Sequence, residues 1–172
     1  MPKQAINSPH KTIVLNKLQF QGKSNDCGPT TTATVINALK NSNLEAKTLA
    51  KVMNKPRRRG LLIVVRRVPN WATFPWGMAD VFREYGLRSS WRFKASPEEI
   101  KADLAEGQIV MPVIGSWRPL WAHVMTLLAW TPENRWGFAN TQYEQHELYW
   151  LSDQVFQQRW RAMGRLVIQI KT

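Results

Sequence analysis

The sequence predicts an α+β domain in which N-terminal helices pack on a C-terminal antiparallel sheet. The first half of the chain has apolar residues at helical spacing and recognisable helix starts, whereas the second half has short runs rich in β-branched and aromatic residues. The chain has 172 residues, 44% of them hydrophobic, which is enough for one domain with a substantial core. We therefore expect a single domain over residues 1–172, of which residues 1–12 could form a loose N-terminal tail.

The first half holds most of the expected helices. Loose alternation over residues 11–20 predicts an initial strand. A helix then starts at Gly28, because Pro29 is tolerated in a first turn, where no amide donor is needed. Ser96, Pro97 and Glu99 together form a helix start with a capping box. The expected helices are 28–40, 48–54, 75–85, 96–107 and 152–160.

The strands are expected mainly in the second half. β-branched and aromatic content marks them, and the turn at 131–135 fits a hairpin. Residues 61–65 are either a strand or a buried segment, within a basic, tryptophan-containing stretch at 55–80 whose role the sequence does not indicate. The expected strands are 87–93, 109–114, 121–130, 135–140, 145–151 and 165–170.

Positive charge is concentrated in one region. The net charge is +12, and residues 47–67 hold eight basic residues and no acidic one. Such a patch would attract phosphates, acidic peptides or an anionic membrane surface, or it would be a solvated loop that keeps the protein soluble. An acidic partner is therefore possible, but no nucleic-acid partner is expected because the chain lacks a recognisable nucleic-acid motif.

Other classes of protein are disfavoured. No signal peptide is recognisable and the longest apolar run is too short to span a bilayer, so we expect a cytoplasmic location. One cysteine cannot form an internal disulfide. No metal site or cofactor is expected, because the three histidines are scattered and there is no glycine-rich phosphate loop.

The single cysteine, Cys27, is the candidate nucleophile. Alone, a cysteine is more often a small buried hydrophobe. However, Cys27 stands at a helix start, six residues after Gln21. A helix N-terminus and a nearby imidazolium would both favour the thiolate, which predicts a thiol that ionises well below pH ~8. The side chain of Gln21 and the backbone N–H of Cys27 would suit an oxyanion.

His123 and Asn140 are the candidate base and the group that orients it. His123 lies near the start of the strand 121–130, and Asn140 ends the next strand. A hairpin between these strands would bring the two side chains together. Taken singly, His123 could be a core histidine and Asn140 a turn former. Trp121, on the same side of its strand as His123, and Trp76 are candidates for substrate binding.

These residues resemble a known family, the bacteriocin-processing (double-glycine leader) cysteine peptidases of the papain-like superfamily. Gln21 and the sequence Asp26-Cys27-Gly28 match its spacing, and His123 and Asn140 lie seventeen residues apart, as the family's base and orienting residue do. The closing helix with its serine, phenylalanine and tryptophan is similar as well, so the resemblance runs from about residue 15 to the end. The sequence departs from the family in one site residue, since Asn140 stands where aspartate is usual.

The resemblance implies a papain-like fold and a peptidase that cleaves peptide bonds through an acyl-enzyme, with peptide or protein substrates. Two alternatives remain open. The same residues could serve an acyltransferase or amidase, because the sequence does not reveal whether water or an amine takes the acyl group. The domain could also be catalytically silent and bind extended peptides or acidic partners.

Overall fold

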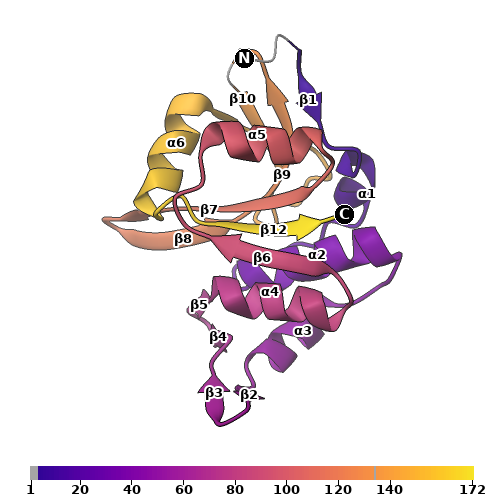
Figure 1. Ribbon diagram of the computed structural model, residues 1–172, viewed down its shortest axis with the longest axis vertical. Coiled ribbons are helices and arrows are strands. Elements are labelled where there is room, and N and C mark those ends of the chain that lie inside the picture. Colours follow the sequence, from indigo (N-terminus) through magenta and orange to yellow (C-terminus); the bar gives the residue numbers. More distant parts are fainter. Residues whose placement is uncertain (1–3, 134) are drawn as a thin grey trace.

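A large antiparallel sheet forms the centre of the molecule (Figure 1). A computed structural model describes residues 4–133 and 135–172. The strands run in the order β11-β10-β9-β7-β12-β6, with β1 paired to β9 and β8 paired to β7. Their bounds are β1 Ile6–Asn7, β6 Arg88–Arg92, β7 Ile109–Trp117, β8 Leu120–Val124, β9 Thr126–Thr131, β10 Arg135–Ala139, β11 Tyr149–Ser152 and β12 Val167–Lys171.

Helices cover both faces of this sheet. Side chains alternate along β7, so Ile109 and Met111 face one core while Val110 and Ile114 face the other. The first core is shared with α1 (Lys11–Asn16), α2 (Cys27–Lys40), α3 (Ala46–Met53) and α4 (Pro75–Glu84). The second is shared with α5 (Pro97–Ala105) and α6 (Asp153–Ala162). The expected α+β architecture is therefore confirmed.

Local sequence signals account for several boundaries. The capping box at the start of α5 is present, with Ser96 accepting from the Glu99 backbone and the Glu99 side chain accepting from the Ser96 backbone. Ser152 accepts a hydrogen bond from the Val155 backbone at the start of α6. Gly86, just after α4, has a φ of +72°, which is the left-handed conformation that glycine adopts readily.

Three expectations about the chain were wrong. Residues 11–16 form a helix rather than a strand, because Val14 is fully buried against the first core on a short helical turn. Within the described residues, 4–12 are not a loose tail, since Ile6 and Asn7 pair with β9. The strand expected over 121–130 is broken at Met125: β8 pairs with β7, and β9 pairs mainly with β10.

The basic stretch between α3 and α4 forms two small hairpins. The first joins β2 (Arg57–Arg59) to β3 (Leu62–Val64), and the second joins β4 (Arg67–Val68) to β5 (Ala72–Thr73). The segment at 61–65 is thus a strand, but its side chains are largely exposed rather than buried. The buried residues of this stretch include two arginines, Arg66 and Arg67.

Arg66 attaches the two hairpins to α3 and α4. Its guanidinium donates to the carbonyl of Val52 at 2.6 Å and to the carboxylate of Glu84 at 3.1 Å. Its own carbonyl accepts from the backbone N–H of Phe74. Gly77 of α4 packs so closely here that an added Cβ would lie 2.3 Å from the carbonyl oxygen of Arg66. A glycine is therefore required where α4 packs against the backbone of Arg66.

Gly77→Ala should destabilise the fold. The added methyl group meets backbone rather than a movable side chain, so we expect a loss of about 1–3 kcal/mol in the free energy of unfolding. Chemical denaturation followed by circular dichroism measures this loss. An unchanged midpoint would mean that α4 does not approach Arg66 as closely as described.

Candidate active site

Cys27 is the first residue of α2, at the end of the helix that approaches the sheet. The helix is held there by burial of nearly all its length, and Thr31 donates to the carbonyl of Val124 at 3.3 Å. An added Cβ on Gly28 would lie 2.4 Å from the Cβ of Thr73, so the residue after the cysteine is tightly confined. The sulfur thus sits between β8 and the second small hairpin.

His123 and Asn140 are in direct contact. His123 Nε2 lies 2.8 Å from Asn140 Oδ1, and both residues are buried. The backbone N–H of Gln142 donates to the same Oδ1 at 3.0 Å, which identifies that atom as the amide oxygen. Since this oxygen can only accept, His123 must donate from Nε2. Its Nδ1 is then the nitrogen with a lone pair, which is the atom that a general base uses.

The strand pairing that brings His123 to Asn140 differs from the one predicted from the sequence. Asn140 was expected opposite His123 within one continuous hairpin. Instead His123 pairs with Ile114 of β7, and the chain changes partner at Met125 before β9 runs beside β10. His123 on β8 thus contacts Asn140, which directly follows β10, although β8 and β10 are not paired.

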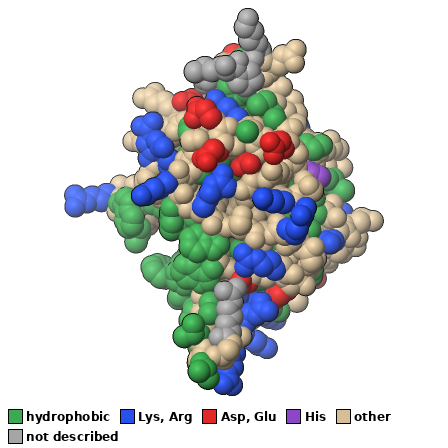
Figure 2. Space-filling view, viewed as in Figure 1, with side chains coloured by type: hydrophobic (Ala, Val, Ile, Leu, Met, Phe, Trp, Pro, Cys, Tyr) green, Lys and Arg blue, Asp and Glu red, His purple; other side chains and the backbone are tan. Residues whose placement is uncertain are grey.

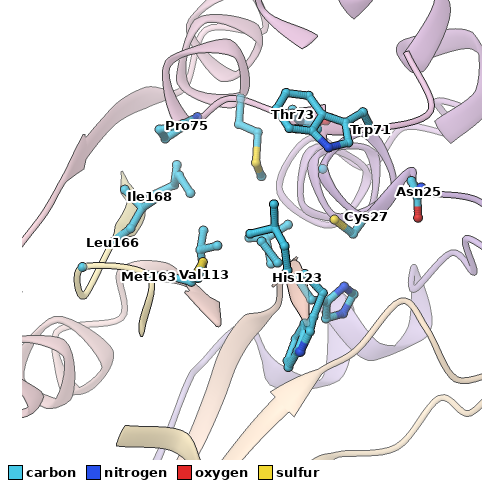
Figure 3. A pocket seen from close by; sticks show the side chains of 18 of the residues that line it. Asn25, Cys27, Trp71, Thr73, Pro75, Val113, His123, Met163, Leu166 and Ile168 are labelled. Carbon is cyan, nitrogen blue, oxygen red and sulfur yellow. The ribbon is translucent and has the colours of Figure 1, made fainter. Parts of the chain in front are cut away.

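Two cavities meet at Cys27 and His123, and both residues line each of them. The larger has a volume of about 640 Å³ and mostly apolar walls, including Met78, Val113 and Ile168. The smaller, of about 200 Å³, is more polar and is lined by Gln21, Asn25 and Gln142 among others. Figure 3 shows Cys27 and His123 facing the cavity from the helix and from the sheet.

Gln21 lies in the smaller cavity with its amide orientation defined. Its Nε2 donates to the carbonyl of Ser24 at 3.0 Å, and its Oε1 accepts from the hydroxyl of Thr141 at 2.9 Å. An amide nitrogen carries two hydrogens, so one N–H remains for a substrate oxygen. Gln19, two residues earlier, instead bonds to Leu44 and Ala46 and belongs to the loop before α3.

Burial dominates the electrostatics of the cysteine and the histidine. Burial raises the pKa of the Cys27 thiol, although hydrogen bonds from the backbone at Val124 and Gly28 and the charge of Arg67 lower it. Burial lowers the pKa of His123, and the bond to Asn140 opposes that shift. Both shifts favour neutral groups. The raised pKa of Cys27 runs against the expectation of a thiol that ionises well below pH ~8.

An ion pair lies directly behind the cysteine. The side chain of Asp26 binds Arg67, whose guanidinium also donates to Asn54 at 2.8 Å. The Arg67 side chain is only 2% exposed, so its charge acts in a poorly solvated region. Asp26 is the N-cap residue of α2, but its side chain makes no capping bond. Sequence reasoning missed this role of Arg67, because nothing distinguishes it from the other basic residues of the run.

The tryptophans divide into two groups. Trp121 lines both cavities, as expected, and the Arg159 guanidinium lies 5.6 Å from its ring. Trp76, also expected to bind substrate, does not line either cavity. It stacks on Phe74 with ring centroids 4.5 Å apart and donates to the carbonyl of Val65. Trp71 and Trp117 line the larger cavity instead.

Comparisons with known proteins show the family and the fold. The model of the Peptidase_C39 like family matches residues 13–168, so the chain belongs to that family. Among solved structures, a protein from Bacillus anthracis described as a C39-like peptidase has a similar fold. It superposes with a TM-score of 0.68 at 13% identity, over 90% of this chain and 93% of the other. A search of curated proteins finds no significant match. Family and fold are those of cysteine peptidases, and the expected papain-like fold is confirmed.

The raised pKa of Cys27 predicts slow alkylation at neutral pH. In the folded protein the iodoacetamide rate should keep rising above pH ~8.5, because a thiol with a raised pKa is less ionised at any lower pH. The same chain unfolded in urea is the control, and its single cysteine should react faster near neutral pH. A rate that is already maximal near pH ~6 and exceeds that of the unfolded chain would contradict this prediction.

Substitutions of Asn140 should move the pKa of His123 in opposite directions. Asn140→Ala removes a hydrogen bond that raises this pKa, so the pKa should fall further. Asn140→Asp places a carboxylate beside the ring and should raise the pKa by about 1–3 units. Titration of the ring signals by NMR measures both shifts. A shift in the same direction for the two variants would show that Asn140 does not act on this ring.

Proposed function

We propose that the protein is a thiol peptidase that hydrolyses a peptide bond through an acyl-enzyme on Cys27. The observation that carries the proposal is the hydrogen bond from His123 to Asn140, because it leaves Nδ1 as a base beside the cavity that Cys27 lines. A thiol, an oriented imidazole and an amide donor around one cavity are the parts that acyl transfer to sulfur requires.

The first half of the reaction forms the acyl-enzyme. As the sulfur attacks the carbonyl carbon, its proton passes to Nδ1 of His123, so the resting site starts with neutral groups. The carbonyl oxygen becomes an oxyanion, for which the unused N–H of Gln21 and the backbone N–H of Cys27 are the donors. The imidazolium then gives its proton to the leaving amine as the C–N bond breaks, and a thioester remains.

The second half returns the enzyme. Water takes the place of the amine, loses a proton to His123 and attacks the thioester carbon. The C–S bond breaks, the sulfur regains the proton, and a carboxylic acid leaves. Asn140 holds the imidazole in one orientation through both halves. Asn140 is uncharged, so it stabilises the imidazolium less than the aspartate usual in the family would.

The cavities favour a substrate with bulky apolar side chains. A volume of about 640 Å³ lined by Met78, Phe93, Trp117 and other apolar residues is of the size that ordinarily encloses a small organic group. Two glycines would leave most of this surface uncovered. The double-glycine specificity implied by the family resemblance therefore has less support here than cleavage beside a large apolar residue. The basic patch at 47–67 would add attraction for acidic stretches of a substrate.

Part of that patch is neutralised within the protein. Arg67 is paired with Asp26, and both Arg57 and Arg66 contact Glu84. The exposed charges of the patch include Lys47, Lys51, Lys55 and Arg58. An acidic partner would be held by these lysines and by the first small hairpin rather than by the whole run of basic residues.

The cleavage test uses an unfolded protein as substrate, with new N-termini identified by mass spectrometry. We expect Cys27→Ala to abolish cleavage, and cut sites to be enriched in large apolar residues. Cuts confined to double-glycine sites would contradict the apolar preference but not the peptidase. No cleavage of any substrate, with a Cys27 that forms no thioester, would contradict the peptidase itself.

Gln21→Ala should reduce kcat by about 10²–10³-fold with little change in KM, because an oxyanion donor acts in the transition state. Gln19→Ala is the matched control, since Gln19 has the same side chain nearby but lies outside both cavities. Steady-state kinetics on a peptide found in the cleavage test provide the measurement. Equal losses in the two variants would assign Gln21 a structural role only.

A further inference from the structure

The β2–β3 hairpin carries exposed aliphatic residues away from the body of the protein. Leu61, Leu62 and Ile63 are 93%, 71% and 75% exposed. Figure 1 shows this hairpin projecting at one end of the long axis, beyond α3 and α4. Water-exposed clusters of large aliphatic side chains are unfavourable unless something covers them, and they commonly mark an interaction site.

The hairpin is amphipathic across its two strands. Strand β2 consists of three arginines and β3 of three aliphatic residues, and the register pairs Arg57 with Val64, Arg58 with Ile63 and Arg59 with Leu62. Arg57 is paired with Glu84, whereas Arg58 is exposed and supplies positive charge opposite Ile63. A partner that covers this hairpin would therefore need both anionic groups and an apolar phase.

The base of the hairpin is firmly held. Beyond β3, Arg66 is bound to Glu84 and to the Val52 carbonyl, and Trp76 donates to the carbonyl of Val65 at 2.9 Å. Arg67 continues the attachment to Asp26, the neighbour of the proposed nucleophile. The exposed tip is thus presented by a fixed support that is joined to the active site.

A second apolar tip lies at the mouth of the larger cavity. Trp117 and Leu120, at the turn between β7 and β8, are 70% and 62% exposed and line that cavity. Trp71, which is 64% exposed, lines it as well. In the view of Figure 1 the β7–β8 turn and the β2–β3 hairpin project on the left and at the bottom. Figure 2 shows hydrophobic side chains gathered along the edge between them.

We propose that these two tips dock the protein on an anionic lipid membrane, with the larger cavity opening beside the lipid surface. The side chains that would enter the lipid surface are those of Leu61, Leu62, Ile63, Trp117 and Leu120. Aliphatic tips enter the interface, tryptophan suits the boundary between headgroups and chains, and arginines bind lipid phosphates.

Charge favours this occupant over a second copy of the chain. The net charge is +12, so two copies would repel each other, whereas an anionic surface attracts the whole molecule. A folded protein partner would need a surface whose shape matches both tips at once. A fluid lipid surface needs no such match, because it adapts to both tips. The described part of the chain holds no helix able to cross a membrane, which suits docking from one side.

Flotation of the full-length protein with vesicles tests the proposal. We expect binding to vesicles that contain phosphatidylglycerol and little binding to phosphatidylcholine alone. Leu62→Ser combined with Ile63→Ser should weaken binding by at least about tenfold, since two large aliphatic side chains no longer enter the interface. Peptide cleavage in solution should stay unchanged in this variant, because neither residue lines the cavities.

Two pairs of matched variants test whether binding depends on the hairpin itself or only on the overall charge of the protein. Ile13→Ser, at a 38% exposed position of α1, controls for Ile63→Ser, and Lys171→Gln, on β12, controls for Arg58→Gln. Only the hairpin member of each pair should weaken binding strongly. Raising the salt concentration should weaken binding by wild type without removing the difference between Ile63→Ser and Ile13→Ser.

Two results would overturn the proposal. One is an absence of binding to phosphatidylglycerol vesicles, even if the hairpin binds an acidic protein instead. The other is binding that depends on salt alone and is equal in Ile63→Ser and Ile13→Ser, which would reduce the interaction to non-specific attraction of a basic protein.

Discussion

The hydrogen bond between His123 and Asn140 is the interaction on which the proposed chemistry of this protein depends. It joins β8 to the segment after β10, and it decides which nitrogen of the imidazole carries the proton. The backbone N–H of Gln142 donates to the same atom of Asn140, which identifies that atom as the amide oxygen and therefore as an acceptor. With Nε2–H committed to Asn140, Nδ1 can serve as the base. Removing the bond would leave a buried histidine free to adopt the opposite tautomer.

Much of the site could be predicted because its signals are local or follow a family spacing. The family model matches residues 13–168, as the resemblance carried by Gln21, Cys27, His123 and Asn140 led us to expect. The contact of His123 with Asn140 was expected, but the prediction assumed one continuous hairpin between their strands. The strand expected over 121–130 breaks at Met125, and the mainly apolar sequence around it does not mark such a break.

Other features depend on tertiary contacts that periodicity does not reveal. Trp76 packs on Phe74 instead of lining the cavities as expected. Arg66 and Arg67 are buried because Glu84 and Asp26 come from distant parts of the chain. The thiol is less acidic than a helix N-terminus alone predicts, because burial outweighs the favourable backbone and charge contributions.

The two small hairpins between α3 and α4 connect the apolar tip to the start of α2, where Cys27 lies. Their buried arginines reach both Glu84 on α4 and Asp26 at the start of α2, so the same segment supports the exposed tip and the ion pair behind Cys27. The result is a peptidase-family fold in which one basic segment contributes to electrostatics at the thiol and to the outer surface. The larger cavity, lined by Trp71, lies beside this segment.

The tautomer of His123 tests the central claim most directly. Nitrogen NMR of the ring in the resting protein, at a pH where the imidazole is neutral, distinguishes a protonated nitrogen from a bare one. The account predicts a proton on Nε2 and none on Nδ1. A proton on Nδ1 with a bare Nε2 would contradict it, because the nitrogen needed to accept the thiol proton would already be occupied.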